Sequence, residues 1–328
     1  MSDAPLIRVT GARLHYHVGG ALAAMRGRAQ VVKAVDGITF DLRAGESVGL
    51  LGESGCGKTS TGRMLLKLDA PTEGSISFDG ADITTLKGPD LRRFRTRAQM
   101  IFQNPFEALN PRFTIRAALA EPLENARIPL AEHEPRIHRV MELVRLPDPE
   151  QFLDRFPHQL SGGQLQRIVM ARALILDPVF VVADEPVSML DVSVRAGVLN
   201  VFRDVRARLG LTAIYISHDL ALVRYVCERT IVMYLGRIVE DGPTEDIVRE
   251  PLHPYTRALV AAVPVPHPDQ SHAPLPIGRG APDSRNPPSG CTFRDRCPAA
   301  MARCATQAPG PTPVGNRLVH CHLYDRAE

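Results

Sequence analysis

A glycine-rich stretch has the residue types of a loop that holds phosphate groups. It reads Gly52-Glu-Ser-Gly-Cys-Gly-Lys58-Thr59, which fits the pattern of a glycine, four residues and then Gly-Lys-Ser/Thr. Glycines allow successive backbone N–H groups to turn inward around phosphate oxygens, and a following helix N-terminus adds its positive dipole end. The alternative is a strand-to-helix turn that matches by chance, but the strand-like and helix-like flanks favour a phosphate loop. The residues predicted to contact the phosphates are Gly52, Glu53, Ser54, Gly55, Cys56, Gly57, Lys58, Thr59 and Ser60.

Two adjacent carboxylates follow an apolar run further along the chain. Asp184 and Glu185 come directly after Val181-Val-Ala, so they stand where a strand ends and the chain turns. Beside a phosphate loop, Asp184 would hold a magnesium shell and Glu185 would act as general base toward an attacking water. The alternative is a solvated Asp-Glu pair that opens a loop.

A third motif, Leu160-Ser161-Gly162-Gly163-Gln164, precedes the apolar run Ile168–Leu176. Ser161 is a natural helix N-cap, and the two glycines would let backbone amides approach an anion at the start of the helix. From physical chemistry alone, the stretch could equally be no more than a capped helix.

Alternating strand-like and helix-like segments position these motifs. Val48–Leu51, Ala98–Phe102, Val179–Ala183 and Thr212–Ile216 read as strands, Thr59–Leu68 as a helix, and Ser75–Phe78 as an exposed hairpin strand. Ile137, Val140, Met141 and Val144 mark one face of a further helix. This alternation predicts an α/β fold with a mostly parallel sheet. Gly19–Arg28 is expected to be an exposed loop.

Bulk composition excludes several classes of protein. The chain has 328 residues, a formal net charge of +3, 5% aromatic residues and no Trp, which does not suit a nucleic-acid binder. No apolar stretch approaches the roughly 18 residues that a spanning helix needs, and the N-terminus lacks the apolar core of a signal peptide. A cytoplasmic location is the default expectation.

The composition changes near Pro251. Fourteen of the 28 prolines lie from that residue onward, so the tail cannot form long helices or central strands. After a last helix that ends near Val263, we expect a loop-rich extension, which must be stabilised by something other than a large apolar core. Four cysteines lie in this extension, and in a reducing compartment such a cluster favours a metal site over disulfides. Their spacing leaves zinc, an iron–sulfur cluster and free thiols open: the cysteines are Cys291, Cys297, Cys304 and Cys321.

Taken together, the motifs resemble the nucleotide-binding domain of ABC transporters over roughly residues 5–255. LSGGQ is the signature of that family and stands unaltered at residues 160–164. Gln103 matches the family's Gln loop, which contacts magnesium and water, and Asp191 of Ser188-Met-Leu-Asp matches the loop that crosses the dimer interface. His218 matches the switch histidine at the γ-phosphate, and Tyr16 is the best match for the aromatic residue that stacks on adenine.

The resemblance implies a P-loop NTPase domain over residues 1–255. We expect a RecA-like parallel-sheet core, an antiparallel β subdomain, and a helical subdomain at about 106–175 that carries the signature. The Pro/Cys-rich extension would span 256–328. ATP and Mg²⁺ are the implied ligands, and each ATP would lie between the phosphate loop of one subunit and the signature of a second one. The implied magnesium contacts are Thr59, Gln103 and Asp184, and the implied catalytic residues are Glu185, His218 and Gln103.

A finer resemblance points to the ATPase subunits of oligopeptide and dipeptide importers. It rests on Asn110-Pro-Arg112, Glu121-Pro-Leu, His253-Pro-Tyr-Thr-Arg-Ala-Leu259 and the cysteine-rich tail. Leu109-Asn-Pro-Arg112 and Ala262-Val-Pro-Val-Pro266 look like the second of the two ATPases that such systems encode. Some relatives carry a four-iron cluster in this tail, which favours iron over zinc at the four cysteines.

These resemblances imply an ATP hydrolase that energises peptide uptake. Its partners would be a paralogous ATPase, two membrane permease subunits and an extracellular solute-binding protein at the cytoplasmic face of the membrane. Nickel and glutathione importers share the architecture and are alternatives for the cargo. A soluble ABC ATPase of translation or repair is a less favoured alternative, because the chain has one such domain and no sustained heptads. A regulator without turnover is disfavoured by Glu185 and His218.

Overall fold

The computed structural model describes residues 4–18, 30–263 and 284–325, and the chain forms two compact units. The phosphate-loop unit combines residues 5–41, 47–84 and 216–328, and the signature unit consists mainly of residues 42–46 and 85–215. The predicted loop Gly19–Arg28 lies outside the described residues, as do the last three residues of the string Ala262–Pro266.

An antiparallel sheet forms the first part of the phosphate-loop unit. Its strand order is β2-β1-β4-β5, and β1 pairs with β4 in a register that places Ile7 opposite Phe78. β4 contains the strand expected at Ser75–Phe78 and pairs with β5, but of these residues only Ser75 is exposed, whereas Ile76 and Phe78 are buried. The strands are β1 (Ile7–Val18), β2 (Gln30–Leu42), β4 (Glu73–Phe78) and β5 (Ala81–Asp82).

Five further strands of this unit follow the order β11-β12-β10-β9-β3. β3 and β9 are parallel, with Val48 opposite Arg229, and every residue of β3 is buried. A continuous apolar run of this kind is typical of a strand that is covered on both faces. The strands are β3 (Ser47–Leu51), β9 (Arg229–Tyr234), β10 (Arg237–Pro243), β11 (Thr312–Val314) and β12 (Arg317–Val319).

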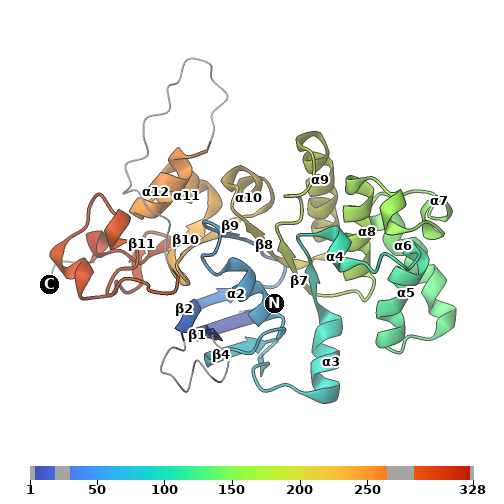
Figure 1. Ribbon diagram of the computed structural model, residues 1–328, viewed down its shortest axis with the longest axis horizontal. Helices are drawn as coiled ribbons and strands as arrows, with labels where there is room; N and C mark the ends of the chain where they lie inside the picture. The colour runs from blue at the N-terminus through green and yellow to red at the C-terminus, as the bar shows by residue number, and fades with distance from the viewer. Residues whose placement is uncertain (1–3, 19–29, 264–283, 326–328) are drawn as a thin grey trace, which may run out of the picture. The chain divides into compact units, whose positions relative to one another are not determined.

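Four helices of the described residues belong to the same unit as these strands (Figure 1). The helix after the phosphate loop ends at Leu65 rather than at the expected Leu68, because the chain turns and Lys67 adopts a φ of 52°. The expected last helix is present and ends at Ala261. The helices are α2 (Lys58–Leu65), α10 (Leu220–Val226), α11 (Thr244–Arg249) and α12 (Pro254–Ala261).

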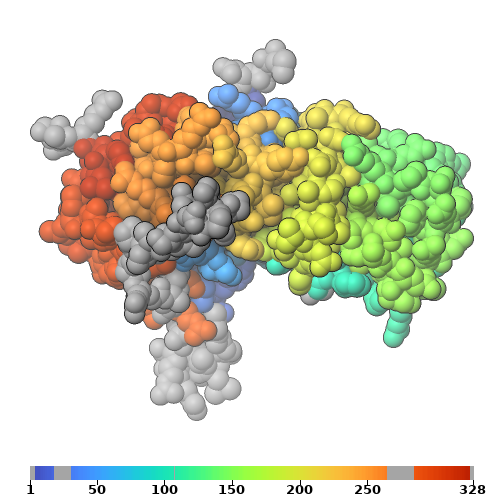
Figure 2. All heavy atoms as spheres, turned by 90° about the horizontal axis from the view of Figure 1, so that it is seen from above, coloured from blue at the N-terminus to red at the C-terminus, as the bar shows by residue number. Residues whose placement is uncertain are grey.

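The described part of the extension, residues 284–325, packs on its own unit. In Figure 2 its red atoms lie against the orange surface formed by residues 240–263. Short 3₁₀ turns dominate it, as its proline content predicts, but β11 and β12 form a hairpin that the loop-rich expectation missed. β12 pairs with β10, with Val319 opposite Glu240, so the extension continues a sheet of the main domain.

In the signature unit, three strands follow the order β8-β7-β6. β6 and β7 are parallel, and every residue of β7 and β8 is buried, as expected for parallel core strands. The strands are β6 (Ala98–Ile101), β7 (Phe180–Asp184) and β8 (Thr212–Ser217), and the last two residues of β8 belong to the phosphate-loop unit. The helices are α3 (Gly88–Arg97), α4 (Pro105–Ala108), α5 (Ile115–Asn125), α6 (His133–Leu143), α7 (Glu150–Leu153), α8 (Gly162–Leu174) and α9 (Val192–Leu209).

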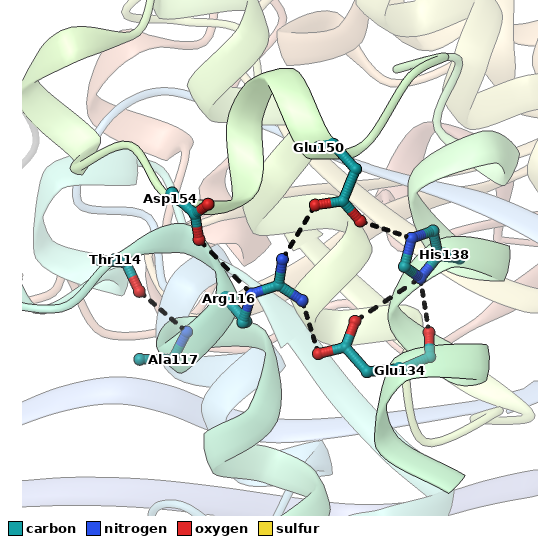
Figure 3. Close-up of polar contacts among 7 residues, drawn as sticks. All are labelled: Thr114, Arg116, Ala117, Glu134, His138, Glu150 and Asp154. Atoms are coloured by element: carbon teal, nitrogen blue, oxygen red, sulfur yellow. Dashed lines mark hydrogen bonds and ion pairs between the residues drawn. The ribbon is translucent and has the colours of Figure 1, made fainter.

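Ion pairs tie the helices α5, α6 and α7 together (Figure 3). Arg116 of α5 donates to Glu134 of α6 and, at 3.0 Å, to Glu150 of α7. His138 of α6 bonds the other oxygen of Glu150 at 3.0 Å. Beneath these charges the expected helix face is buried, with Ile137, Val140, Met141 and Val144 all at 1% exposure or less. Apolar packing inside and ion pairs outside therefore stabilise this group of helices.

No helix among residues 4–18, 30–263 and 284–325 combines the length and apolar character that crossing a membrane requires.

Candidate active site

The phosphate loop joins β3 to α2 within the phosphate-loop unit. Gly57 sits at the helix N-cap with a φ of 104°, a backbone conformation that favours glycine. A Cβ at this position would lie 2.1 Å from the carbonyl oxygen of Ala34, so no other residue fits without moving the backbone. Ser54, Gly55 and Thr59 remain exposed, which leaves this part of the loop accessible to a ligand.

Lys58 is folded onto the loop that precedes it. Its side chain is buried, and its ammonium group donates to the carbonyl oxygens of Gly52 and Glu53 at 2.7 and 2.9 Å. The Sγ of Cys56 lies 3.9 Å from the same nitrogen, and burial raises the pKa of the Cys56 thiol although the positive charge of Lys58 opposes the rise. A loop with a buried ammonium group at its centre is suited to binding an anion.

Tyr16 and His218 also belong to the phosphate-loop unit. The Tyr16 ring is 38% exposed, and its hydroxyl donates to Asp69 at 3.0 Å, while Arg63 of α2 holds the same carboxylate. Burial raises the pKa of the Tyr16 hydroxyl, whereas a hydrogen bond with Ser60 opposes the rise. His218 is exposed and follows directly on β8. Tyr16 is therefore linked to the helix that follows the phosphate loop.

The carboxylate pair lies in the signature unit, at the end of β7. Asp184 is 4% exposed, and Glu185 adopts a φ of 43°, a strained conformation for a residue with a side chain. The amide nitrogen of Gln103 donates to the Glu185 carboxylate at 3.1 Å, and it lies 3.4 Å from the hydroxyl of Ser188. Residues from three separate motifs of the sequence therefore meet around one carboxylate.

The signature forms a reciprocal helix cap. The backbone N–H of Gln164 donates to the Ser161 hydroxyl at 3.4 Å, and the backbone N–H of Ser161 donates to the Gln164 side chain at 3.0 Å. Ser161 and Gly162 are exposed at the start of α8. A Cβ on Gly163 would lie 2.5 Å from Val194 of α9, so this glycine also permits close helix packing.

The loop between Glu185 and α9 presents its residues to solvent. Asp191 is exposed, and its neighbours Met189 and Val192 are 63% and 79% exposed. Arg195 of α9 stabilises the loop by donating hydrogen bonds to the carbonyl oxygens of Leu190 at 2.9 Å and Ser188 at 3.4 Å. Sequence reasoning missed Arg195, because its partners are backbone atoms that no motif marks.

Two protein-family models match the chain. Residues 35–188 match the ABC transporter model, and residues 239–304 match the C-terminal region of oligopeptide/dipeptide transporters. A putative peptide import ATP-binding protein of Brucella ovis is 49% identical over 310 residues, which cover 94% of each chain. The chain belongs to the ABC transporter ATP-binding family. Within it, this ABC ATPase has the C-terminal region that the oligopeptide/dipeptide branch carries.

Other relatives and solved structures agree with that membership. The putative oligopeptide transport protein YkfD of Bacillus subtilis is 43% identical over 335 residues, covering 100% of this chain and 98% of its own. The di/tripeptide transport protein DppF of Pseudomonas aeruginosa is 43% identical over 309 residues, covering 94% of each. The ATP-binding cassette MJ0796, solved as a dimer with ADP and phosphate, is similar with a TM-score of 0.63 at 25% identity, over 73% of this chain and 98% of its own.

The ABC ATPase also has contacts at the phosphate loop that the sequence motifs did not reveal. The backbone N–H of Glu53 donates to the Tyr255 hydroxyl at 2.9 Å. The Glu53 carboxylate accepts hydrogen bonds from both terminal nitrogens of Arg296, at 2.9 and 3.0 Å. Tyr255 lies in the string His253–Leu259, which the sequence marked as typical of the family branch but without a role. No sequence pattern indicated that Arg296 contacts the phosphate loop, because its partner Glu53 is 243 residues away.

His253, to which sequence reasoning assigned nothing, caps α12. Its ring Nδ1 accepts from the backbone N–H of Tyr255 at 3.0 Å, and the backbone N–H of His253 donates to the carboxylate of the buried Glu240 at 2.9 Å. Burial lowers the pKa of His253 to about 3, helped by the charges of His320 and Arg257. The ring is therefore neutral at physiological pH and acts as a cap, which holds Tyr255 in position.

The four extension cysteines are free thiols that influence one another. Burial, together with smaller contributions from the charges of Cys291, Cys297 and Cys304, raises the pKa of Cys321 to about 11. The backbone N–H of Cys291 donates to the carbonyl of Cys304 at 2.9 Å. In the described ranges, however, no group of three or more His, Cys, Asp or Glu side chains is spaced to hold a metal ion. The predicted iron–sulfur or zinc site is thus not preformed.

Proposed function

We propose that this ABC ATPase binds and hydrolyses ATP to energise the uptake of oligopeptides or dipeptides across a membrane. The observation that carries the proposal is the joint presence of an intact set of ATPase motifs and the oligopeptide/dipeptide C-terminal region in one chain. Its relatives, which are named as peptide import, oligopeptide transport and di/tripeptide transport ATP-binding proteins, support peptides as the cargo.

In the proposed site, residues 52–60 surround the phosphates of ATP and Tyr16 supports the adenine. Lys58 would leave the carbonyls of Gly52 and Glu53 and turn to the β- and γ-phosphates. Mg²⁺ would be held by the hydroxyl of Thr59, the amide oxygen of Gln103 and the carboxylate of Asp184, which are oxygen donors of the kind this ion prefers. The Gln103 nitrogen that bonds Glu185 leaves the amide oxygen available for this role.

Hydrolysis follows from the position proposed for Glu185. The carboxylate accepts a proton from a water molecule as the water oxygen forms a bond to the γ-phosphorus, while the bond from that phosphorus to the β,γ-bridging oxygen breaks. ADP and phosphate are the products. His218 would contact the γ-phosphate, and the hydrogen bond from Gln103 keeps the Glu185 carboxylate oriented toward the water.

The proposed working unit is a dimer with a paralogous ATPase. Ser161, Gly162, Gly163 and Gln164 would bind the partner's ATP, and Asp191 would cross the interface. Ser161, Asp191 and the apolar Met189 and Val192 are all exposed in the single chain, which supports the proposal that a partner subunit covers them in the dimer. Two permease subunits and an extracellular solute-binding protein would complete the complex, with this chain peripheral at the cytoplasmic face. Within the chain we propose an ATPase domain over residues 1–255, a helical subdomain at about 106–175 and an extension over 256–328.

For the extension we propose that Cys291, Cys297, Cys304 and Cys321 hold a four-iron cluster, with zinc as the alternative. Burial, and then the neighbouring thiols, raise the pKa of Cys291, Cys297 and Cys321, so these thiols are costly to ionise alone, and a bound cation would remove that cost. The donor set is suitable for either metal. The resemblance of the cysteine-rich tail to that of peptide-importer ATPases favours iron over zinc. The bound group would order the proline-rich segment.

Mutation of Lys58 tests the phosphate loop. We expect Lys58→Ala to weaken ATP binding and to slow turnover, because the phosphate charge loses its neutralising partner. A binding titration with a fluorescent ATP analogue and a steady-state assay with the partner subunits measure both. Unchanged affinity and unchanged turnover would refute the assignment.

Metal analysis tests the extension. We expect protein purified without oxygen to contain about four iron atoms and to absorb visible light, and a Cys321→Ser variant to lose both properties. A colourless protein with stoichiometric zinc, or with no metal, would refute the cluster.

A further inference from the structure

A residue of the extension reaches the phosphate loop and pairs with its one acidic residue. Arg296 is the last residue of a 3₁₀ turn (Arg294–Arg296) between Cys291 and Cys297, and both of its terminal nitrogens bond the Glu53 carboxylate, at 2.9 and 3.0 Å. The Arg296 side chain is 14% exposed and that of Glu53 is 31% exposed. A bidentate pair of this kind is stronger and more specific in geometry than an ordinary surface ion pair.

Aromatic side chains hold the guanidinium in place. Arg296 lies over the rings of Tyr234 and Phe293, at 5.8 and 6.0 Å from their centroids, and it is 3.4 Å from the Tyr234 hydroxyl. Both rings are buried and pack against each other edge to face at 5.2 Å. The Glu53 carboxylate, and then Tyr234, raise the pKa of Arg296, so its positive charge is permanent. The guanidinium is therefore fixed before any nucleotide binds.

The same acidic residue is anchored through its backbone. Its N–H donates to the Tyr255 hydroxyl at 2.9 Å, and the Tyr255 ring packs against those of Tyr234 and Phe293 at 4.7 and 5.4 Å. One aromatic cluster thus contacts Glu53 directly and also positions the arginine that binds its side chain. The extension and the first residues of the phosphate loop therefore contact the same aromatic cluster.

The charge of Glu53 is the reason why this contact matters. A carboxylate within a loop that binds a polyanion repels the phosphates, and the repulsion is only partly screened at a half-buried site. Arg296 cancels this charge without occupying the exposed part of the loop. We propose that Arg296 of the C-terminal extension is a positioning residue that neutralises Glu53 and thereby sets the ATP affinity of the phosphate loop in the same chain. The proposal rests on the nucleotide site proposed above.

The signs of the expected effects distinguish this role from a structural one. Arg296→Ala leaves the Glu53 charge uncompensated, so we expect ATP affinity to fall on the order of threefold to tenfold. Glu53→Gln removes the negative charge and its repulsion of the phosphates, so affinity should rise. In the double variant the repulsion is absent, and affinity should return to within about twofold of Glu53→Gln alone.

The experiment is an equilibrium titration of the full chain with a fluorescent ATP analogue at low and high salt, accompanied by thermal unfolding. Arg294→Ala is the matched control, because Arg294 belongs to the same turn but bonds only Ser289, Asp295 and Ala305 within the extension. It should not change the affinity. High salt should reduce the effect of Arg296→Ala. Should Arg296→Ala fail to fold, Arg296→Gln, which keeps the side-chain stem, replaces it.

Two results would overturn the proposal. One is an unchanged affinity for Arg296→Ala, and the other is a double variant that binds as weakly as Arg296→Ala, which would indicate a structural role alone. Failure of the nucleotide site itself is distinguishable, because in that case Lys58→Ala would also leave the affinity unchanged.

Discussion

At the scale of single residues, the proposed general base, Glu185, has a positive φ, a backbone conformation that residues with a side chain rarely adopt. Glu185 has a φ of 43°, and its carboxylate is bonded by Gln103. Strained backbone of this kind persists where the surrounding structure determines the conformation, and it is common at functional sites. The cost is consistent with a carboxylate that must face a particular water molecule.

Replacing this carboxylate by an amide tests its role. We expect Glu185→Gln to reduce steady-state ATP hydrolysis by about two to four orders of magnitude while ATP binding is retained, because an amide cannot accept the proton of water but keeps the shape. The measurement is phosphate release by the variant with its partner subunits present. Hydrolysis near the wild-type rate would show that another group is the base.

At the scale of elements, the signature helix is positioned by contact with its neighbour. α8 begins with a reciprocal cap, and Gly163 in its first turn faces Val194 of α9 closely enough that a Cβ would lie at 2.5 Å. The glycines of the signature therefore have a packing reason in addition to any role at an anion. The loop that carries Asp191 leads directly into α9, so the same packing relates the signature to that loop.

This packing predicts a pair of compensating changes. We expect Gly163→Ala to lower the free energy of unfolding by about 1–3 kcal/mol, because the added methyl group overpacks the contact with Val194. Val194→Ala removes the opposing methyl groups, so the double variant should regain part of this loss. Urea denaturation measures both effects. Equal stability of Gly163→Ala and wild type would show that the two helices can separate at no cost.

At the scale of the whole molecule, the two proposed halves of an ATP site lie in different units of the chain, and in the proposed dimer each half completes the site of the other subunit. The phosphate loop and the signature belong to different units of the chain, and Ser161 is exposed at the N-terminus of its helix. The exposed signature, and the exposed apolar residues Met189 and Val192, support the proposal that a second subunit covers this surface.

The isolated chain should therefore be a weak ATPase. We expect turnover to rise when the paralogous ATPase and the permease subunits are added, since the signature of one subunit would complete the site of the other. Phosphate release measured across a range of protein concentrations, with size determined by light scattering, tests this. Full activity from a preparation that remains monomeric would contradict the dimer.

Local and contiguous features could be determined from the sequence by itself. The phosphate loop, the Asp184-Glu185 pair and the capped signature are short strings whose local structure depends on neighbouring residues along the chain, so the sequence predicts the turn, the strand end and the helix cap at which they lie. The parallel core strands were likewise predictable, because burial on both faces requires continuous apolar runs. The expected helix limits were wrong by only a few residues.

Only the tertiary structure decided which distant residues meet. Arg296 pairs with Glu53 across 243 positions, Gln103 reaches Glu185 across 82, and β12 of the extension pairs with β10. None of these contacts follows from a local pattern, because an arginine or a glutamine is compatible with many exposed positions until the packing of the chain selects its partner. The buried aromatic cluster of Tyr234, Tyr255 and Phe293 makes that selection at the phosphate loop.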